Sequence, residues 1–230
     1  MNELTNAKNW NPLFKLGGLT ALLMAAIIIV QAVLFIVAPP PYEGSALDWF
    51  MLFQNNTLIG LIDFEFLMIV YVILSIPTTL ALCVLLGRTS PSFIAVYLAL
   101  SLVGVISFIA ARPVFEMLAL SAKYAASTTE AQRAAYLASG ETALAAFHGT
   151  AFHVSYVLGS ISGLIVSLVM LKTDVFSKTT AYLRIASSIF DFGLYIPMVG
   201  LFISLFSVFF LLAWDILIAR RLFQLASNKE

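Results

Sequence analysis

The sequence predicts an all-α integral membrane protein, a polytopic bundle of six transmembrane helices that forms one domain, 1–230, with both termini in the cytoplasm. Apolar residues make up 61% of the chain and charged residues only 10%. About a quarter of the residues in soluble domains are charged, so this chain has too little polar side chain to cover a soluble globule. Several apolar runs reach the roughly 20 residues that a helix needs to cross a hydrocarbon core of about 30 Å. The third observation is that basic residues gather at alternate ends of these runs.

Charge and cysteine content exclude two other classes of protein. The chain has 12 basic and 12 acidic residues. It therefore has no excess of basic side chains for binding nucleic acid. The one cysteine, Cys83, lies in an apolar run and excludes an intramolecular disulfide framework. We expect it to be a buried, unreactive thiol.

The first apolar run is expected to be a spanning helix and not a cleaved signal peptide. Lys8 and Lys15 precede it, but the run from Leu16 to Ala38 is too long for a signal-peptide core and three prolines follow it. The expected transmembrane helices are 15–38, 57–87, 91–111, 142–171, 181–196 and 199–220. The expected outer loops are 39–56 and 112–140.

The last apolar stretch, 182–219, is longer than a bilayer is thick and is interpreted as two helices. Pro197 lacks an amide donor, and Gly200 permits turn geometry. The pair therefore predicts a tight hairpin near the middle of this stretch.

The distribution of basic residues favours six helices. With the N-terminus inside, most of them fall on the cytoplasmic side, as the positive-inside rule expects. The residues expected inside are Lys8, Lys15, Arg88, Lys172, Lys178, Arg184, Arg220, Arg221 and Lys229. Those expected outside are Arg112, Lys123 and Arg133. A five-helix arrangement would leave the Arg220-Arg221 pair outside and fits the rule less well.

The two outer loops carry different signals. The first holds an aromatic group suited to the membrane interface: Trp49, Phe50 and Phe53. In the second, Ser127 and Glu130 have the spacing of a capping box. This spacing predicts a short surface helix that leads into the span at 142–171.

One gap-free register of the chain against itself suggests an internal duplication. In this register Tyr71-Val72 corresponds to Tyr156-Val157, and Ser75-Ile76 corresponds to Ser160-Ile161. The second and third spans would then be a parallel repeat of the fourth and fifth, as in some transporters. Asp63 corresponds to His148 in this register.

Ionisable side chains inside spanning segments need a partner or a function, because each costs about 2.5–3.5 kcal/mol at the bilayer centre. Asp63, His148 and Asp191 fall at similar depth in the outer half of the bilayer, so we expect them to form a cluster. Glu65 or His153 is expected to join them as an occasional fourth member. Asp215 lies about one turn from Arg220 and is expected to pair with it.

Small residues on the fourth span predict close helix packing. They recur every four residues and end in a GxxxG pattern: Ala151, Ser155, Gly159 and Gly163. His148 precedes Ser155 by two turns and should lie on the same face. An exposed ridge of small residues would also allow a homodimer.

Three interpretations of the polar cluster remain open. In the first, His148 and an aspartate satisfy each other in a closed helix interface of a structural or accessory subunit. In the second, which we favour, the cluster binds a proton, a cation or a small polar ligand for transport or sensing. Its expected apolar vestibule consists of Phe64, Phe147, Phe152 and Tyr156.

The third interpretation is an intramembrane hydrolase that acts on a lipid-like substrate. Asp63, His148 and Asp191 would hold a divalent metal that activates water. No HExxH or comparable spacing supports such a site, so the pattern implies no cofactor strongly. The sequence leaves open whether the protein is an enzyme.

Two stretches resemble an uncharacterised family of prokaryotic six-helix membrane proteins. The first contains Gly140-Glu141, the run from Phe147 to His153, and Tyr156-Val157-Leu158-Gly159. The second contains Gly193-Leu194-Tyr195-Ile196-Pro197, then Trp214 and Ala219-Arg220-Arg221-Leu222. The resemblance implies a prokaryotic cytoplasmic membrane and six helices, and it implies no activity.

Overall fold

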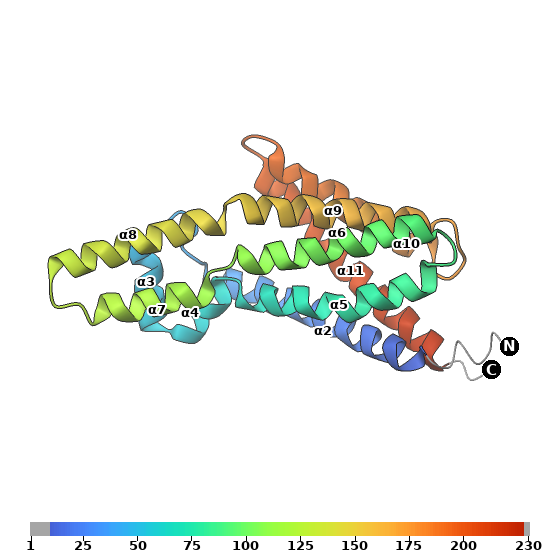
Figure 1. Ribbon diagram of the computed structural model, residues 1–230, viewed down its shortest axis with the longest axis horizontal. Helices are drawn as coiled ribbons and strands as arrows, with labels where there is room; N and C mark the ends of the chain where they lie inside the picture. Colours follow the sequence, from blue (N-terminus) through green and yellow to red (C-terminus); the bar gives the residue numbers. More distant parts are fainter. Residues whose placement is uncertain (1–9, 228–230) are drawn as a thin grey trace. The chain divides into compact units, whose positions relative to one another are not determined.

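The computed structural model describes residues 10–227, in which all regular structure is helical (Figure 1). The elements are α2 (Asn11–Val37), α3 (Ala46–Asn55), α4 (Thr57–Asp63), α5 (Phe66–Leu86), α6 (Pro91–Ala110), α7 (Val114–Ala125), α8 (Glu130–Phe147), α9 (Thr150–Met170), α10 (Lys178–Phe192), the 3₁₀ turn η1 (Gly193–Tyr195) and α11 (Gly200–Ser227). Lys8 and Lys229, both expected on the cytoplasmic side, lie outside the described residues.

The described chain has five helical stretches that are long and apolar enough to cross a membrane. They are α2, α5, α6 with α7, α8 with α9, and α11. These helices are compatible with a multi-pass membrane protein. The expected fifth span, 181–196, corresponds to α10, whose 15 residues rise only about 22 Å. That is shorter than a hydrocarbon core, so the count of six and the cytoplasmic termini stay predictions.

The helices form two compact units, each with its own apolar core. Unit 1 holds the described residues up to Ile28, then Tyr71–Val105, and those from Ser155 onward. Unit 2 holds Ile29–Val70 and Ile106–Val154. The boundaries lie inside α2, α5, α6 and α9, so neither unit is a separate stretch of chain.

In unit 1, α2 and α5 approach closely at Gly17. Thr78 Oγ1 donates a hydrogen bond to the Gly17 carbonyl at 2.9 Å, and the Thr20 and Thr78 hydroxyls lie 2.9 Å apart. A Cβ on Gly17 would lie only 3.1 Å from the Ala81 side chain. A small residue here therefore lets the two backbones approach, which is how helices associate where the hydrophobic effect is absent.

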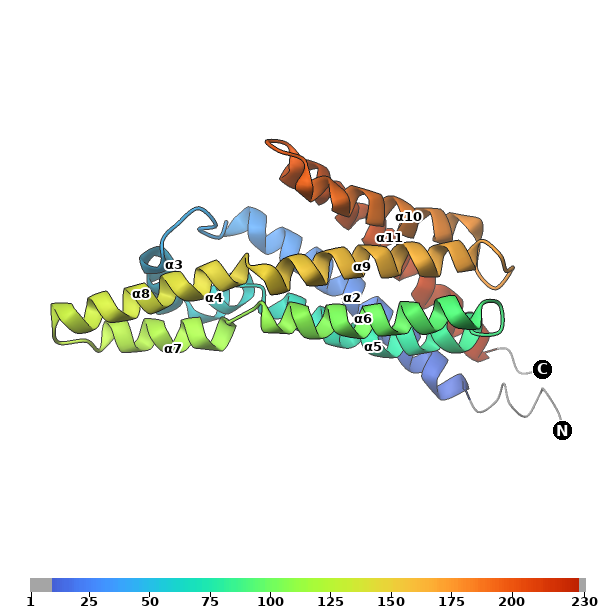
Figure 2. The same cartoon turned by 45° about the horizontal axis from the view of Figure 1, so that its top comes forward.

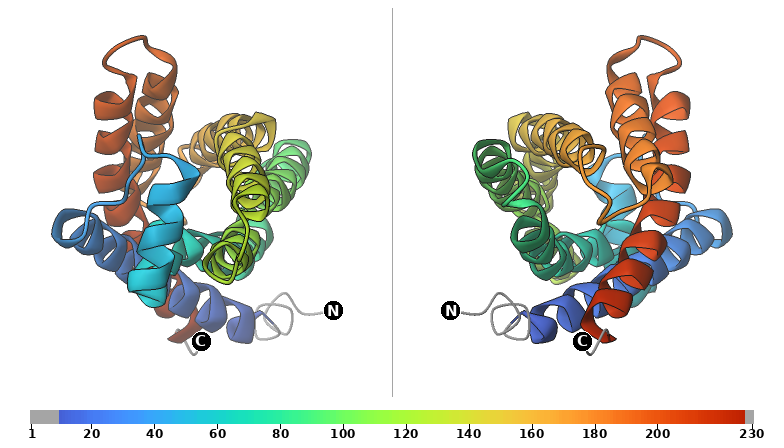
Figure 3. Two further views of the ribbon diagram at one scale, coloured as in Figure 1. Left: turned by 90° about the vertical axis from the view of Figure 1, so that its left-hand side faces the viewer. Right: turned by 90° about the vertical axis from the view of Figure 1, so that its right-hand side faces the viewer.

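α10 and α11 lie side by side as an antiparallel hairpin (Figure 3). The turn lies at Pro197 and Gly200, where the sequence predicts it. A Cβ on Gly193 would overlap Ile203, and one on Gly200 would overlap the Leu194 carbonyl. Only glycine leaves space for the chain to turn this tightly.

In unit 2, the second outer loop is a helical hairpin and not a short surface helix. α7 and α8 lie side by side along their length (Figure 2). The N-cap of α8 is Thr129, which accepts from the Gln132 amide at 3.2 Å. Ser127 instead donates to the Lys123 carbonyl at the end of α7. The capping box expected at Ser127 and Glu130 is therefore replaced by a cap two residues later.

The aromatic group of the first outer loop is buried, although the sequence suggested an interfacial position. A capping box of Ser45 and Asp48 starts α3. Trp49, Phe50 and Phe53 then share one face of this helix, because Phe53 lies about one turn after the other two. That face packs into the core of unit 2. The largest fully buried side chains of that core are Trp49, Phe50, Phe53, Phe64 and Met117.

α3 crosses α8 at Gly140 and Glu141. A Cβ on Gly140 would lie 2.7 Å from that of Ala46, so a larger residue would separate the helices. Glu141 accepts a hydrogen bond of 2.7 Å from the Ala46 amide at the start of α3. This contact satisfies one of the free amides that every helix leaves at its first turn.

Candidate functional site

The expected span at 57–87 is divided into α4 and α5 by a break at Phe64 and Glu65. Glu65 has a φ of 64°, a left-handed conformation that a non-glycine residue rarely adopts. The turn is closed by a hydrogen bond of 2.9 Å from the Glu65 amide to the Ile62 carbonyl. The break points the Glu65 side chain away from the α5 helix and toward Arg112.

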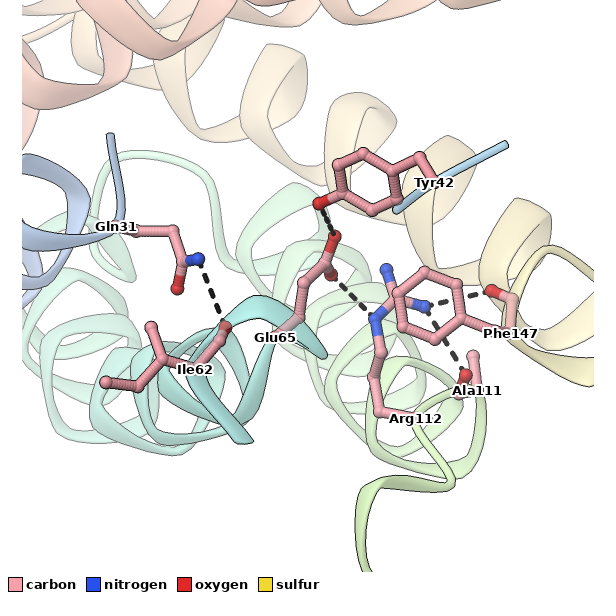
Figure 4. Close-up of polar contacts among 7 residues, drawn as sticks. All are labelled: Gln31, Tyr42, Ile62, Glu65, Ala111, Arg112 and Phe147. Atoms are coloured by element: carbon pink, nitrogen blue, oxygen red, sulfur yellow. Dashed lines mark hydrogen bonds and ion pairs between the residues drawn. The ribbon is translucent and has the colours of Figure 1, made fainter. Parts of the chain in front are cut away.

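Arg112 and Glu65 form a buried ion pair. Arg112 Nε lies 2.7 Å from Glu65 Oε2, and the two side chains are 2% and 17% exposed. The Tyr42 hydroxyl donates to Glu65 Oε1 at 3.4 Å (Figure 4). Tyr42 is 41% exposed, but desolvation of its hydroxyl, followed by the nearby Glu65 carboxylate, raises its pKa far above the usual range, so the hydroxyl stays a donor.

The same arginine joins two more helix ends. Its Nη1 donates to the Phe147 carbonyl at 3.1 Å and to the Ala111 carbonyl at 3.4 Å (Figure 4). Phe147 is the last residue of α8, and Ala111 follows the end of α6. Carbonyls at helix ends lack intrahelical partners. Arg112 therefore satisfies orphan carbonyls at two breaks while it neutralises the carboxylate at a third.

Aromatic rings enclose the Arg112 guanidinium. Its Cζ lies 4.3 Å from the ring centroid of Phe108, 4.1 Å from that of Phe147 and 5.1 Å from that of Phe152. Each contact is a cation–π interaction, which strengthens when the cation is desolvated. We call Tyr42, Glu65, Arg112 and these rings the arginine clasp.

Asp63, two residues before Glu65, has no such neutralising group. Its side chain is 1% exposed, and neither carboxylate oxygen has a hydrogen-bond partner within residues 10–227. Gln31 donates through Nε2 to the Ile62 carbonyl at 3.1 Å, and its own Oε1 is also buried without a partner in the described chain. Unit 2 therefore buries three acceptor oxygens without a partner among residues 10–227, and one of the two side chains that carry them, Asp63, can bear a full charge.

The two histidines lie on the outside of unit 2. His148 is the C-cap residue after α8, is exposed, and contacts the rings of Phe147 and Phe152 at centroid distances of 4.9 and 6.4 Å. His153 is also exposed and lies against Phe152 at 5.2 Å. Because Asp63 has no partner in the described residues, the expected pair of Asp63 and His148 is not joined by a hydrogen bond. Gly149 breaks the expected span at 142–171 between the two histidines.

The rings expected to form a vestibule divide between the two units. Phe64 and Phe147 are 0% and 3% exposed and pack in the core of unit 2. Phe152 stacks on Arg112, as described above. Tyr156 belongs to unit 1, together with Asp191.

In unit 1, Asp191 on α10 accepts hydrogen bonds from two hydroxyls of α9. Tyr156 Oη lies 3.4 Å from Oδ1, and Ser160 Oγ lies 3.3 Å from Oδ2. Tyr156 also contacts the Ser204 hydroxyl of α11. The groups that face this carboxylate are therefore neutral hydroxyls, and the single Ser160 proton is shared with the Tyr156 carbonyl at 2.9 Å.

Asp215 lies fully buried on α11 and accepts from the Tyr71 hydroxyl at 3.1 Å. Its other oxygen, Oδ1, has no partner among the described residues. The expected pairing with Arg220 is not found in residues 10–227, because the Arg220 side chain is exposed and Asp215 is enclosed by the helices of unit 1.

The small residues of α9 serve two contacts. Gly104 of α6 faces Ser155 and Gly159, with its Cβ position 3.6 Å from the Ser155 carbonyl. Gly163 faces α10, where Arg184 Cζ and Ser188 Oγ each lie 2.6 Å from the point a Cβ would occupy. Ala151 is half-buried in unit 2. The small-residue stripe from Ser155 to Gly163 is therefore used within the chain.

No three His, Cys, Asp or Glu side chains in residues 10–227 lie close enough together to hold a metal ion. No protein-family model, curated protein or solved structure matches this chain.

Sequence reasoning missed Arg112, Tyr42 and Gln31. The sequence predicts Arg112 on the outer side because it directly follows the expected span 91–111 when the N-terminus is inside. An available signal was Glu65, since an acid near a spanning segment calls for a cationic partner. Tyr42 and Gln31 had no signal in the sequence, because only the fold brings them to the break between α4 and α5.

Proposed function

We propose that this chain is a multi-pass protein of a prokaryotic cytoplasmic membrane that binds a small cation, a proton or a metal ion, at Asp63 for transport or sensing. The observation that carries the proposal is the pair of buried Asp63 oxygens without partners in the described chain. A buried carboxylate without compensation is costly, so it takes up a proton or a cation.

The contrast with Glu65 supports Asp63 as the free group. Glu65 lies two residues away and is already neutralised by Arg112 at 2.7 Å. Gln31 supplies a second kind of oxygen close to this site. Its Nε2 donates to the carbonyl of Ile62, the residue before Asp63, and its neutral Oε1 has no partner in residues 10–227. Carboxylate and amide oxygens are ligands for hard cations.

The element bounds also support the proposed duplication. When the chain is aligned with itself so that Asp63 corresponds to His148, the ends of α5 match those of α9 to within one residue. In the same alignment, α6 overlaps α10. The helix breaks at Phe64–Glu65 and at His148–Gly149 also agree to within one residue. Tyr71 and Tyr156, which also correspond, each donate to an aspartate. The six-helix topology, both termini in the cytoplasm and the prokaryotic membrane remain part of this proposal.

The test is thermal unfolding of the full-length protein in detergent, with choline replaced by Li⁺, Na⁺, K⁺, Mg²⁺ or Ca²⁺ at constant ionic strength and over a series of pH values. We expect one cation, or a falling pH, to raise the unfolding midpoint of the wild type. A ligand at about one hundred times its dissociation constant stabilises by about 2.7 kcal/mol. Asp63→Asn should remove this response and should raise the midpoint in its absence, because the unpaired charge is gone.

The matched control is Asp174→Asn, which removes an exposed aspartate of the α9–α10 loop. It should respond as the wild type does. If Asp63→Asn keeps the full response, or if no cation and no pH affects the wild type, cation binding at Asp63 is ruled out and Asp63 is structural, as in an accessory subunit.

The hydrolase alternative is tested separately by elemental analysis of protein purified without chelator. About one equivalent of zinc, iron or manganese that is lost in His148→Ala would support it. No structural observation in unit 1 or unit 2 favours this alternative over the cation site.

A further inference from the structure

One end of unit 1 has a cavity of about 430 Å³ between the α9–α10 loop and the last turns of α11. Two cationic side chains line it, Lys178 and Arg221, and one acidic side chain, Asp174. Hydroxyls of the loop and the amide of Gln224 complete its polar wall. The cavity therefore has a net positive wall and several hydrogen-bond donors.

The Arg221 guanidinium is fixed at this wall. Its Nε donates to the Val175 carbonyl at 2.5 Å, and the residue is half-buried. Four further N–H groups of the same planar head remain for other acceptors. Lys178 is exposed and can reach an anion as a mobile point charge.

A second cavity, of about 370 Å³, is lined by residues up to Lys172, the residue that precedes Thr173 in the wall of the first cavity. Its wall is apolar, with Phe93 of α6 and Leu168 of α9, except for Lys172 at its edge. The ammonium of Lys172 lies 5.9 Å from the Phe93 ring centroid. Phe93 and Leu168 are 55% and 54% exposed on helices that are apolar enough to cross a membrane, so this wall suits lipid tails.

We infer that the two cavities together bind one anionic phospholipid. The phosphate lies between Lys178 and Arg221, and one acyl chain occupies the apolar cavity beside Phe93. Lys172 lies where the headgroup meets the chain. Basic pockets at the ends of membrane helices attract anionic headgroups, and each lysine or arginine near the surface contributes about fivefold to binding. This inference is independent of cation binding at Asp63.

The experiment measures binding of the full-length protein to phosphatidylglycerol and to phosphatidylcholine, each doped into the same detergent micelles, with inorganic phosphate as a third probe. We expect phosphatidylglycerol to bind and to raise the unfolding midpoint, and the other two to do neither. Lys172→Gln with Lys178→Gln should weaken phosphatidylglycerol binding about fivefold for each lysine. Both lysines are exposed, so the double variant is expected to fold.

The matched control removes the same charge from the α7–α8 hairpin, as Lys123→Gln with Arg133→Gln. It should bind phosphatidylglycerol like the wild type. Equal binding of the two lipids, or equal loss in both double variants, would overturn the inference. Protection by inorganic phosphate alone would assign the cavity to a soluble phosphate and would overturn the lipid as the ligand.

Discussion

Arg112 in unit 2 lies between two helices, whereas Arg184 in unit 1 lies within α10. Different groups accept the hydrogen bonds of the two guanidinium groups. Arg112 pairs with Glu65 at 2.7 Å and caps two helix-end carbonyls. Arg184 donates to the Ser187 hydroxyl at 3.2 Å and the Gly159 carbonyl at 3.3 Å, and lies 5.6 Å from the Trp214 ring. No carboxylate of the described chain lies within ion-pair distance of Arg184.

The difference follows from the backbone around each arginine. Arg112 lies at helix breaks, where carbonyls have no intrahelical partner and can receive a guanidinium. Arg184 faces the interior of α9, where the carbonyls already accept helix hydrogen bonds. The carbonyl it reaches there, that of Gly159, lies 3.3 Å away. Unit 2 therefore concentrates charge at its breaks. In unit 1 the donors to Asp191 and Asp215 are hydroxyl groups, and Asp215 Oδ1 has no partner among the described residues.

The largest expected effect is the loss of the arginine clasp. Arg112→Met should destabilise the protein by about 3–5 kcal/mol, because it leaves Glu65 buried without a counter-charge and frees the Phe147 carbonyl. Thermal unfolding in detergent measures the effect. Glu65→Gln on the same background should recover part of the loss, while the exposed Arg133→Met should change little. A small effect of Arg112→Met would show that the clasp does not hold the three breaks together.

The next largest expected effect on stability comes from filling the space that Gly163 of α9 leaves for the Arg184 side chain. Gly163→Ala should destabilise by about 1–3 kcal/mol, because its Cβ would lie 2.6 Å from the guanidinium. Gly159→Ala is the control, since no atom lies within 4 Å of its Cβ position. It should be neutral or stabilise by about 0.5–1 kcal/mol through helix propensity. Equal effects of the two variants in thermal unfolding would refute the close contact at Gly163.

The smallest expected effect is the difference in stability between two variants that each remove a hydroxyl donor from an aspartate of unit 1. Tyr71→Phe should cost about 1–3 kcal/mol, because the fully buried Asp215 then loses the hydroxyl that satisfies it. Tyr156→Phe should cost about 1 kcal/mol or less, since Asp191 is half-buried and keeps Ser160 at 3.3 Å. The unfolding midpoints of the two variants, compared directly, test this order.

Much of the architecture follows from local sequence. Apolar runs predict α2, α5, α6, α9 and α11 near their observed positions, because burying a spanning backbone requires helices. The hairpin between α10 and α11 is also predicted from the sequence, because proline and glycine change the conformation of their own backbone without help from distant residues. The helix breaks were not predicted. Glu65 is a poor residue for its left-handed conformation. Tertiary contacts with Arg112 and Tyr42, together with the Ile62 turn hydrogen bond, accompany that conformation.

The sequence by itself determined that the chain is helical, apolar and compatible with a membrane, because composition and run length act independently of tertiary contacts. It also showed that Asp63, Glu65, Asp191 and Asp215 each needed a partner. Only the tertiary structure decided which partner each has. An ion pair depends on side chains brought together from distant helices, so Glu65 is neutralised by Arg112 while Asp63 is not.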